Sequence, residues 1–234
     1  MSLLDPMATV VPFPRPRLYG VYPAIVRDVQ DPDSQGRVKV ELPFVASDDA
    51  APAQAWARLA TMMAGAERGS WFIPEVEDEV LVAFTAGDPS RPIVLGALWN
   101  GSDAPPETMD SDNNRRSITS RSGHRLLFDD SAGAEKLLIE TQGGHKLTLD
   151  DASGGTVTLE HSSGAKITID VSGKVEITAN SKVVINAAAQ LSVTAGMVTV
   201  DAGMSKFSGV VKCDTLITNA VISSSYTPGA GNVW

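Results

Sequence analysis

The sequence contains few of the residues on which disulfide-stabilised proteins and many enzymes depend. Among 234 residues there are one cysteine, Cys213, and three histidines, and aromatic residues make up only 6%. A lone cysteine excludes an intrachain disulfide, so the fold does not depend on an oxidising compartment. No stretch approaches the roughly eighteen consecutive apolar residues of a membrane-spanning helix. The chain therefore has the composition of a soluble protein.

Positive charge is also scarce. The net charge is −9, which argues against a protein that binds nucleic acid, because such binding needs a basic surface. Residues 1–20 have no long apolar stretch, and Pro12, Pro14 and Pro16 interrupt them. We therefore expect no signal peptide and a protein that is made and assembled in the cytoplasm.

Composition divides the chain into segments. Residues 1–17 are expected to form an N-terminal arm that is rich in proline, and the polar residues 101–116 are expected to form a linker. Between them, residues 18–100 contain short apolar and β-branched runs that are separated by turn signals. These runs are 20–30, 36–42, 56–63, 79–86 and 92–99. Five such strands predict a small closed barrel, which leaves no strand edge exposed.

A different pattern begins at Ser117. The segments "GHRLLFDD" (123–130), "GHKLTLDD" (144–151) and "GAKITIDV" (164–171) repeat one short strand with their glycines 21 and 20 residues apart. Recurrence at a fixed interval indicates a repeat architecture. Apolar residues in this region come in pairs one residue apart, so both members of a pair point to the same face of a strand.

Such short, one-sided strands cannot bury their apolar faces alone, and two architectures would bury them. One is a single-chain β-solenoid, and the other is a prism in which three identical chains wind together over residues 117–225. Only two inward residues per strand make the prism narrow, which favours the intertwined homotrimer and predicts that an isolated protomer does not keep this region folded. The predicted trimer core is Leu147, Leu149, Val157, Leu159, Ile167, Ile169, Val175, Ile177, Val183, Ile185, Leu191 and Val193.

Two stretches carry a family resemblance. The block "WARLATMMAG" (56–65) and "GSWFIPEVEDEVLVAFTAGDPSRPIVLGALWNG" (69–101) resembles the barrel of the phage baseplate assembly protein V family, which is similar to the core of VgrG proteins. "NNRRSITSRSGHRLLFDD" (113–130) resembles the junction between barrel and needle in that family. The resemblance implies an all-β protein in which an N-terminal OB-fold-type barrel precedes a triple-stranded, homotrimeric β-helix.

The same resemblance implies a structural role without an enzymatic activity or a cofactor. The protein would be the central spike of a contractile tail, whether of a phage, a tailocin, an extracellular injection particle or a type VI-like machine. Its implied partners are a baseplate hub protein, a PAAR-like tip protein and, transiently, the envelope of the target cell. The rival hypothesis is a single-chain β-solenoid enzyme that degrades polysaccharide with acidic residues on its wall.

Few residues are candidates for chemistry. The pairs Asp129–Asp130 and Asp150–Asp151 lie where strands end, and neighbours on a strand point to opposite faces, so we interpret them as turn residues and not as a catalytic pair. "DPDSQG" (31–36) imitates a calcium loop, but Leu42 occupies the twelfth position, where an acidic ligand is needed. We predict a hairpin turn there and no metal site.

The histidines and the C-terminus carry two further expectations. His124, His145 and His161 share the parity of the apolar pairs, so an ion on a threefold axis is left open for them, although no metal site is predicted. Residues 226–234 interrupt the strand pattern, and their proline and glycines cannot continue it. We expect Tyr226, Val233 and Trp234 to form a small apolar platform that binds the tip protein.

Overall fold

The computed structural model describes residues 17–46 and 51–225. The chain divides into two units, Met1–Lys182 and Val183–Trp234, which are described separately. The first unit contains a β-barrel and a separate β-sheet. Nowhere in the described ranges is there a helix long and apolar enough to cross a membrane.

The barrel confirms the five predicted strands. They close in the order β1-β2-β3-β7-β6, and all neighbours are antiparallel except β3 and β7, which are parallel. The strands are β1 (Val21–Asp28), β2 (Val38–Ala46), β3 (Pro52–Leu59), β6 (Glu79–Phe84) and β7 (Pro92–Ala97). The sequence did not indicate a small hairpin after β3, which consists of β4 (Ala64–Gly65) and β5 (Arg68–Gly69), or the 3-10 turn η1 (Thr85–Gly87).

The barrel interior follows from alternation along each strand. On β6 the side chains of Val80, Val82 and Phe84 are buried, whereas the residues between them are not. Each of the other four strands contributes residues of one parity to the same cluster. The remaining members of this core are Ala24, Val26, Val38, Val40, Leu42, Ala57 and Val94.

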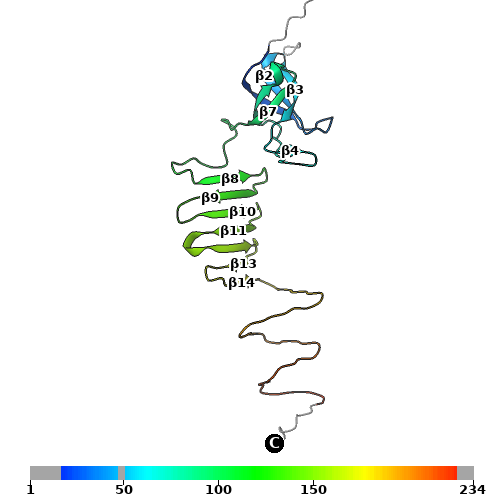
Figure 1. Cartoon of the computed structure of the whole chain (residues 1–234), viewed down its shortest axis with the longest axis vertical. Helices are drawn as coiled ribbons and strands as arrows, with labels where there is room; N and C mark the ends of the chain where they lie inside the picture. Colours follow the sequence, from blue (N-terminus) through cyan, green and yellow to red (C-terminus); the bar gives the residue numbers. More distant parts are fainter. Residues whose placement is uncertain (1–16, 47–50, 226–234) are drawn as a thin grey trace, which may run out of the picture. The chain divides into compact units, whose positions relative to one another are not determined.

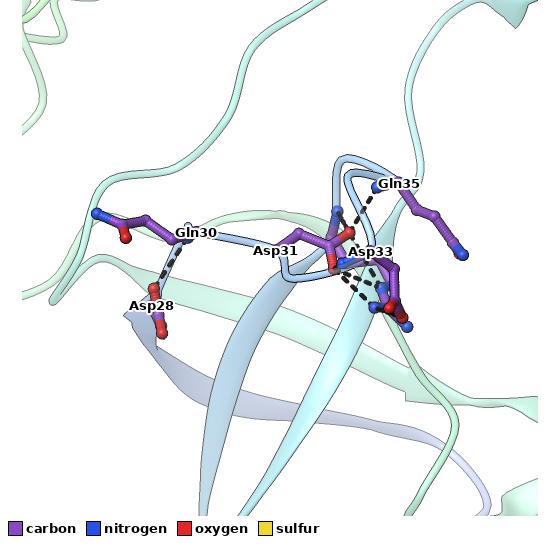
Figure 2. A network of polar contacts seen from close by, with 6 residues as sticks. Asp28, Gln30, Asp31, Asp33 and Gln35 are labelled. Atoms are coloured by element: carbon purple, nitrogen blue, oxygen red, sulfur yellow. Dashed lines mark hydrogen bonds and ion pairs between the residues drawn. The ribbon is translucent and has the colours of Figure 1, made fainter.

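The β1–β2 connection is the predicted hairpin turn, and Asp31 organises it (Figure 2). Its carboxylate accepts hydrogen bonds from the backbone N–H groups of Asp33 at 3.1 Å, Gln35 at 2.8 Å and Arg37 at 3.2 Å. The Arg37 guanidinium binds the same carboxylate at 2.6 Å. Asp31 thus uses its oxygens within the turn, as expected for an Asp that fixes a loop.

The second part of the first unit is a seven-stranded antiparallel sheet in which each strand pairs with its neighbours in sequence (Figure 1). Its strands are β8 (Arg115–Thr119), β9 (Arg125–Asp129), β10 (Lys136–Glu140), β11 (Lys146–Asp150), β12 (Thr156–Glu160), β13 (Lys166–Ile169) and β14 (Val175–Thr178), with a 3-10 turn, η2 (Ala152–Gly154), between β11 and β12. The first strand begins two residues before Ser117, where the repeat region was expected to start.

The sheet explains the 20-residue repeat. The three repeated segments form β9, β11 and β13, and an antiparallel strand lies between successive copies. One repeat is therefore a hairpin of two strands and two turns. At the turns, Gly123, Gly144 and Gly164 have φ values of +83°, +84° and +89°, which glycine adopts without strain. Over β8–β14, neighbouring strands thus belong to one chain. The expectation was that three chains wind together from Ser117 onward, and the structure refines it for this segment.

Residues 179–225 differ from the sheet. Within the described range, no strand follows Thr178. In the second unit, Val183, Ile185, Leu191 and Val193 are each more than half exposed. The backbone runs back and forth without strand pairing (Figure 1).

Candidate functional site

One face of the sheet is almost entirely apolar, and we call it the apolar face. The strand register aligns its side chains in two columns, because residues that oppose each other on neighbouring strands share a face. The first column contains Ile118, Leu126, Ile139, Leu147, Leu159, Ile167 and Ile177. The second contains Phe128, Leu137, Leu149, Val157, Ile169 and Val175, and Arg116 completes it on β8.

The apolar face is not covered within the described part of the chain. Ile169 is 41% exposed and Ile177 is 58% exposed, and most other members of the two columns are similarly accessible. Monomeric soluble proteins rarely expose a continuous apolar surface that extends across seven strands. The face therefore requires a partner surface, and a sheet of this kind is suited to assembly.

The opposite face, which we call the charged face, carries charged side chains, several of which are paired within the chain. Along one edge the register places Arg125, Glu140, Lys146, Glu160 and Lys166 on successive strands, so that the sign of the charge alternates from strand to strand. The Lys146 ammonium lies 3.2 Å from the Glu140 carboxylate. Such cross-strand pairs favour the observed register.

The linker contacts this charged face as well. Glu107 binds the side chains of Ser117 and Arg125, and Arg115 lies 3.9 Å from its carboxylate. The hydrogen bond from Ser117, the one from Arg125 and the nearby positive charges hold the pKa of Glu107 below its ordinary value. The described chain thus supplies partners to the charged face and none to the apolar one.

The predicted trimer-core residues fall into two groups. The eight from Leu147 to Ile177 lie on the apolar face of β11–β14. Val183, Ile185, Leu191 and Val193 lie in the strandless second unit. The predicted platform residues Tyr226, Val233 and Trp234 lie outside the described residues.

The predicted core set left out the members of the apolar face on β8, β9 and β10. These are Ile118, Leu126, Phe128, Leu137 and Ile139. On both β9 and β10 these residues belong to an uninterrupted apolar run, 126–128 and 137–139, in which apolar and polar residues do not alternate. Only the strand pairing shows which parity of each run lies on the apolar face.

The paired carboxylates lie in turns. Asp129 accepts hydrogen bonds from the Ser131 N–H at 3.1 Å and the Ser131 hydroxyl at 2.5 Å, which lower the pKa of its carboxyl together with Lys136 and Arg115 nearby. Asp130 forms an ion pair with Arg116 at 2.5 Å. Asp150 accepts the Ala152 N–H at 2.8 Å. These contacts fix turns and do not direct two carboxyl groups toward a common substrate.

The histidines also take part in turn structure. Nδ1 of His124 accepts the Gln142 N–H at 3.3 Å, and Nδ1 of His145 accepts the Ser162 N–H at 3.2 Å, so each turn on this edge is bonded to the next turn on the same edge. The rings of His145 and His161 lie 4.3 Å apart between centroids. Across residues 17–46 and 51–225, no three His, Cys, Asp or Glu side chains are grouped so that they could hold a metal ion.

Two family models match the chain. Residues 22–99 match the type VI secretion system/phage-baseplate injector OB domain, which corresponds to the barrel. Residues 136–205 match the phage baseplate V C-terminal trimerisation domain, which includes β10–β14 and the first part of the strandless segment. The chain belongs to the phage baseplate V and VgrG-like spike family. The part of the apolar face on β10–β14 lies within the residues that match this trimerisation domain.

Curated relatives agree with this assignment. The type VI secretion system spike protein VgrG3 of Vibrio cholerae is 33% identical over 114 residues, which make up 46% of this chain and 11% of the relative. VgrG1b of Pseudomonas aeruginosa is 32% identical over 116 residues, or 46% of this chain and 16% of the relative. The actin cross-linking toxin VgrG1 of Vibrio cholerae is 30% identical over 114 residues. The chain thus spans less than a fifth of the length of these relatives.

Proposed function

We propose that this protein is the structural central spike of a contractile injection system and that three copies assemble through the apolar face. One observation carries the proposal: a continuous apolar surface lies exposed across β8–β14, and its β10–β14 part lies within the residues that match the trimerisation domain. Three such sheets can form the walls of a three-sided prism and bury their two apolar columns against one another. Burial of each aliphatic side chain contributes about 1.5–3 kcal/mol before the cost of ordering it.

The strandless segment then has a defined role. Its apolar residues still alternate, but its backbone groups have no strand partners in the chain. Backbone groups that are removed from water need hydrogen-bond partners. We propose that in the trimer the segments of three chains wind together and supply these partners, so that the wall changes from single-chain sheets to an intertwined β-helix.

A spike of this kind works by stiffness. It would be assembled in the cytoplasm, its barrel and N-terminal arm would bind a baseplate hub protein, and contraction of the sheath would drive the needle through the target envelope. The C-terminal residues Tyr226, Val233 and Trp234 would form the platform for a PAAR-like tip protein. A test is to co-express a tip protein encoded nearby with the full-length chain and with a variant that lacks residues 226–234. If the shortened trimer binds the tip protein as well as the full-length trimer does, these residues do not form the binding platform.

Mass in solution tests the central proposal. The homotrimer has an expected mass near three times 24.6 kDa, whereas the rival single-chain polysaccharide-degrading enzyme has the mass of one chain. Light scattering coupled to size-exclusion chromatography measures this directly. A stable monomer whose second unit is folded would refute the proposal that the protein is a trimeric spike.

Catalysis distinguishes the same two hypotheses independently. Because the candidate carboxylates hold turns, purified protein is expected neither to clear peptidoglycan nor to depolymerise glycans. Reproducible turnover that disappears in Asp150→Asn or Asp151→Asn variants would favour the enzyme.

A further inference from the structure

The barrel has a basic hollow on its outer wall, in a part of the chain separate from the apolar face of β8–β14. The hollow has a volume of about 410 Å³, and Arg37, Arg58, Arg91 and Trp56 line it together with Gln35, Thr85, Ser90 and Pro92. No acidic residue is among the lining side chains. In a chain of net charge −9, such a concentration of guanidinium groups indicates a specific partner.

Register places these residues on one surface. Lys39 on β2 opposes Trp56 on β3, and Arg58 on β3 opposes Ile93 on β7. Since side chains alternate along strands, Trp56 and Arg58 share the outer face of β3, and Arg91 lies in the connection directly before β7. The hollow is therefore built from β3, the first residue of β7, the end of the β1–β2 turn and the β6–β7 connection.

Two of the three arginines are free to bind a ligand. Arg37 already forms ion pairs with Asp31 at 2.6 Å and Asp33 at 2.5 Å. Arg58 and Arg91 are exposed, and neither forms an ion pair with a carboxylate in the described part of the chain. Asp88 lies close enough to Arg91 for the arginine to contribute to its lowered pKa, but its oxygen is bonded to the N–H and hydroxyl of Ser90.

The chemistry of the hollow favours carboxylates over nucleic acid. Guanidinium groups bind carboxylates and phosphates in paired hydrogen bonds, so charge alone does not distinguish them. Single-stranded nucleic acids also need exposed aromatic faces on which bases stack. Trp56 is the one aromatic side chain in the hollow, and Lys39 and Arg37 lie 5.0 Å and 5.8 Å from its ring centroid. Two cations therefore already approach the one aromatic ring of this hollow.

We propose that this hollow binds an acidic polypeptide segment, with Arg58 and Arg91 holding its carboxylates and Gln35 and Thr85 within the same hollow to donate further hydrogen bonds. The assignment of that segment to a baseplate protein rests on the proposed function, whereas its binding to the barrel does not. The barrel would thus bind the baseplate through this hollow, with an acidic polypeptide segment as the ligand.

Fluorescence anisotropy with a labelled oligoglutamate peptide tests the site on the full-length protein. The wild type is expected to bind, and Arg58→Gln/Arg91→Gln is expected to bind at least about tenfold more weakly, because two charge-assisted contacts are lost. Arg58→Lys/Arg91→Lys keeps the charge and should retain part of the affinity. The matched control is Arg121→Gln, which removes an exposed arginine that lies on a sheet turn and pairs with Glu75.

Each outcome has a defined consequence. Absence of binding by the wild type, or unchanged affinity in the Gln double variant, overturns the proposal. If an oligothymidylate of the same length binds more tightly than the peptide, and the Gln double variant loses this binding, the ligand of the hollow is nucleic acid and not an acidic polypeptide. Mass and melting temperature of every variant are measured alongside, so a failure to trimerise is seen separately from a failure to bind the peptide.

Discussion

Asp31 shows how one side chain sets a connection in the barrel. Its carboxylate is nearly buried, with 4% of the side chain exposed, and it joins the Arg37 guanidinium to three backbone N–H groups of the β1–β2 turn. The hydrogen bond from Arg37, followed by those from the backbone N–H groups, holds the pKa of Asp31 far below its ordinary value. A depressed pKa means that folding favours the ionised carboxylate.

The pH dependence of the barrel follows from this shift. The contribution of Asp31 is complete above the ordinary Asp pKa of about 3.9 and is lost as the pH falls from there toward the depressed value. We expect Asp31→Asn to lower the melting temperature at pH 7, monitored by tryptophan fluorescence. The difference from wild type should narrow as the pH is lowered from 5 to 2, and a difference that stays constant would contradict the assignment. These pH limits are roughly the range over which a carboxyl with this shift titrates.

Ile169 tests the orientation of the sheet in the trimer. It lies on the apolar face, so Ile169→Asp would place three unpaired carboxylates in the proposed interior, at a cost of roughly 3 kcal/mol or more per chain. Assembly should fail, as measured by light scattering. Thr158→Asp is the matched control, because Thr158 lies on the charged face between Thr148 and Thr168.

Thr168 lies on the same face as Thr158 but is a poorer control position. It opposes Glu176 on β14, and two like charges at opposing positions destabilise a sheet. If Ile169→Asp and Thr158→Asp leave equally stable trimers, the apolar face is not the interface.

At the scale of elements, the turns make the sheet possible. Gly144 has a φ of +84°, whereas its neighbour Gly143 does not lie in the left-handed region. In both cases an added Cβ would make only ordinary contacts, at 3.6 Å to Ser162 and at 3.7 Å to the His145 ring. The two positions therefore differ in backbone conformation and not in available space.

This pair gives a matched substitution experiment. Gly144→Ala is expected to destabilise the protein by about 1–2 kcal/mol, because a side chain in the left-handed region is strained. Gly143→Ala is expected to be neutral, or stabilising by up to about 1 kcal/mol, because it restricts the unfolded chain. Denaturant titration measures both, and equal effects would show that the strain argument is wrong for this turn.

The success of sequence reasoning also varied by element. The barrel strands were predictable because each contains a short apolar and β-branched run between clear turn signals. β4 and β5 have two residues each and leave no pattern. β10 was missed because Leu137, Leu138 and Ile139 do not alternate. The periodicity of a strand shows which face is buried but not whether the neighbouring strand belongs to the same chain, so the repeat at Gly123, Gly144 and Gly164 was compatible with wound chains.

The basic hollow could not be inferred from the sequence for a related reason. Trp56 and Arg58 come from β3, whereas Arg37 and Arg91 lie directly before β2 and β7, and only the closed order of the barrel brings them together. The charged face is similar, because its alternating signs become visible only once Lys146 is paired with Glu140 and Glu160. Both surfaces are formed by residues that are distant in the sequence and come together only in the folded chain. The sequence contains no direct signal of these contacts, and its net charge is negative.

At the scale of the whole molecule, the two units differ in where their hydrogen-bond partners come from. Every strand from β8 to β14 pairs within its own chain, whereas residues 183–225 contain no strand in the structure of one chain. If three chains supply these partners to one another, protection of the backbone amides in the second unit depends on assembly. Protection in the barrel does not, since its strands close on themselves.

Hydrogen exchange measured by mass spectrometry separates these contributions. In the wild-type assembly, peptides from residues 183–225 should exchange slowly, because opening them requires the chains to separate locally. In Ile169→Asp, the same peptides should exchange at the rate of an unfolded chain, while barrel peptides from β2 and β6 keep their protection. Thr158→Asp should resemble the wild type. Slow exchange of residues 183–225 in a monomeric variant would show that the second unit folds alone, and the intertwined arrangement would then be wrong even if the sheets still trimerise.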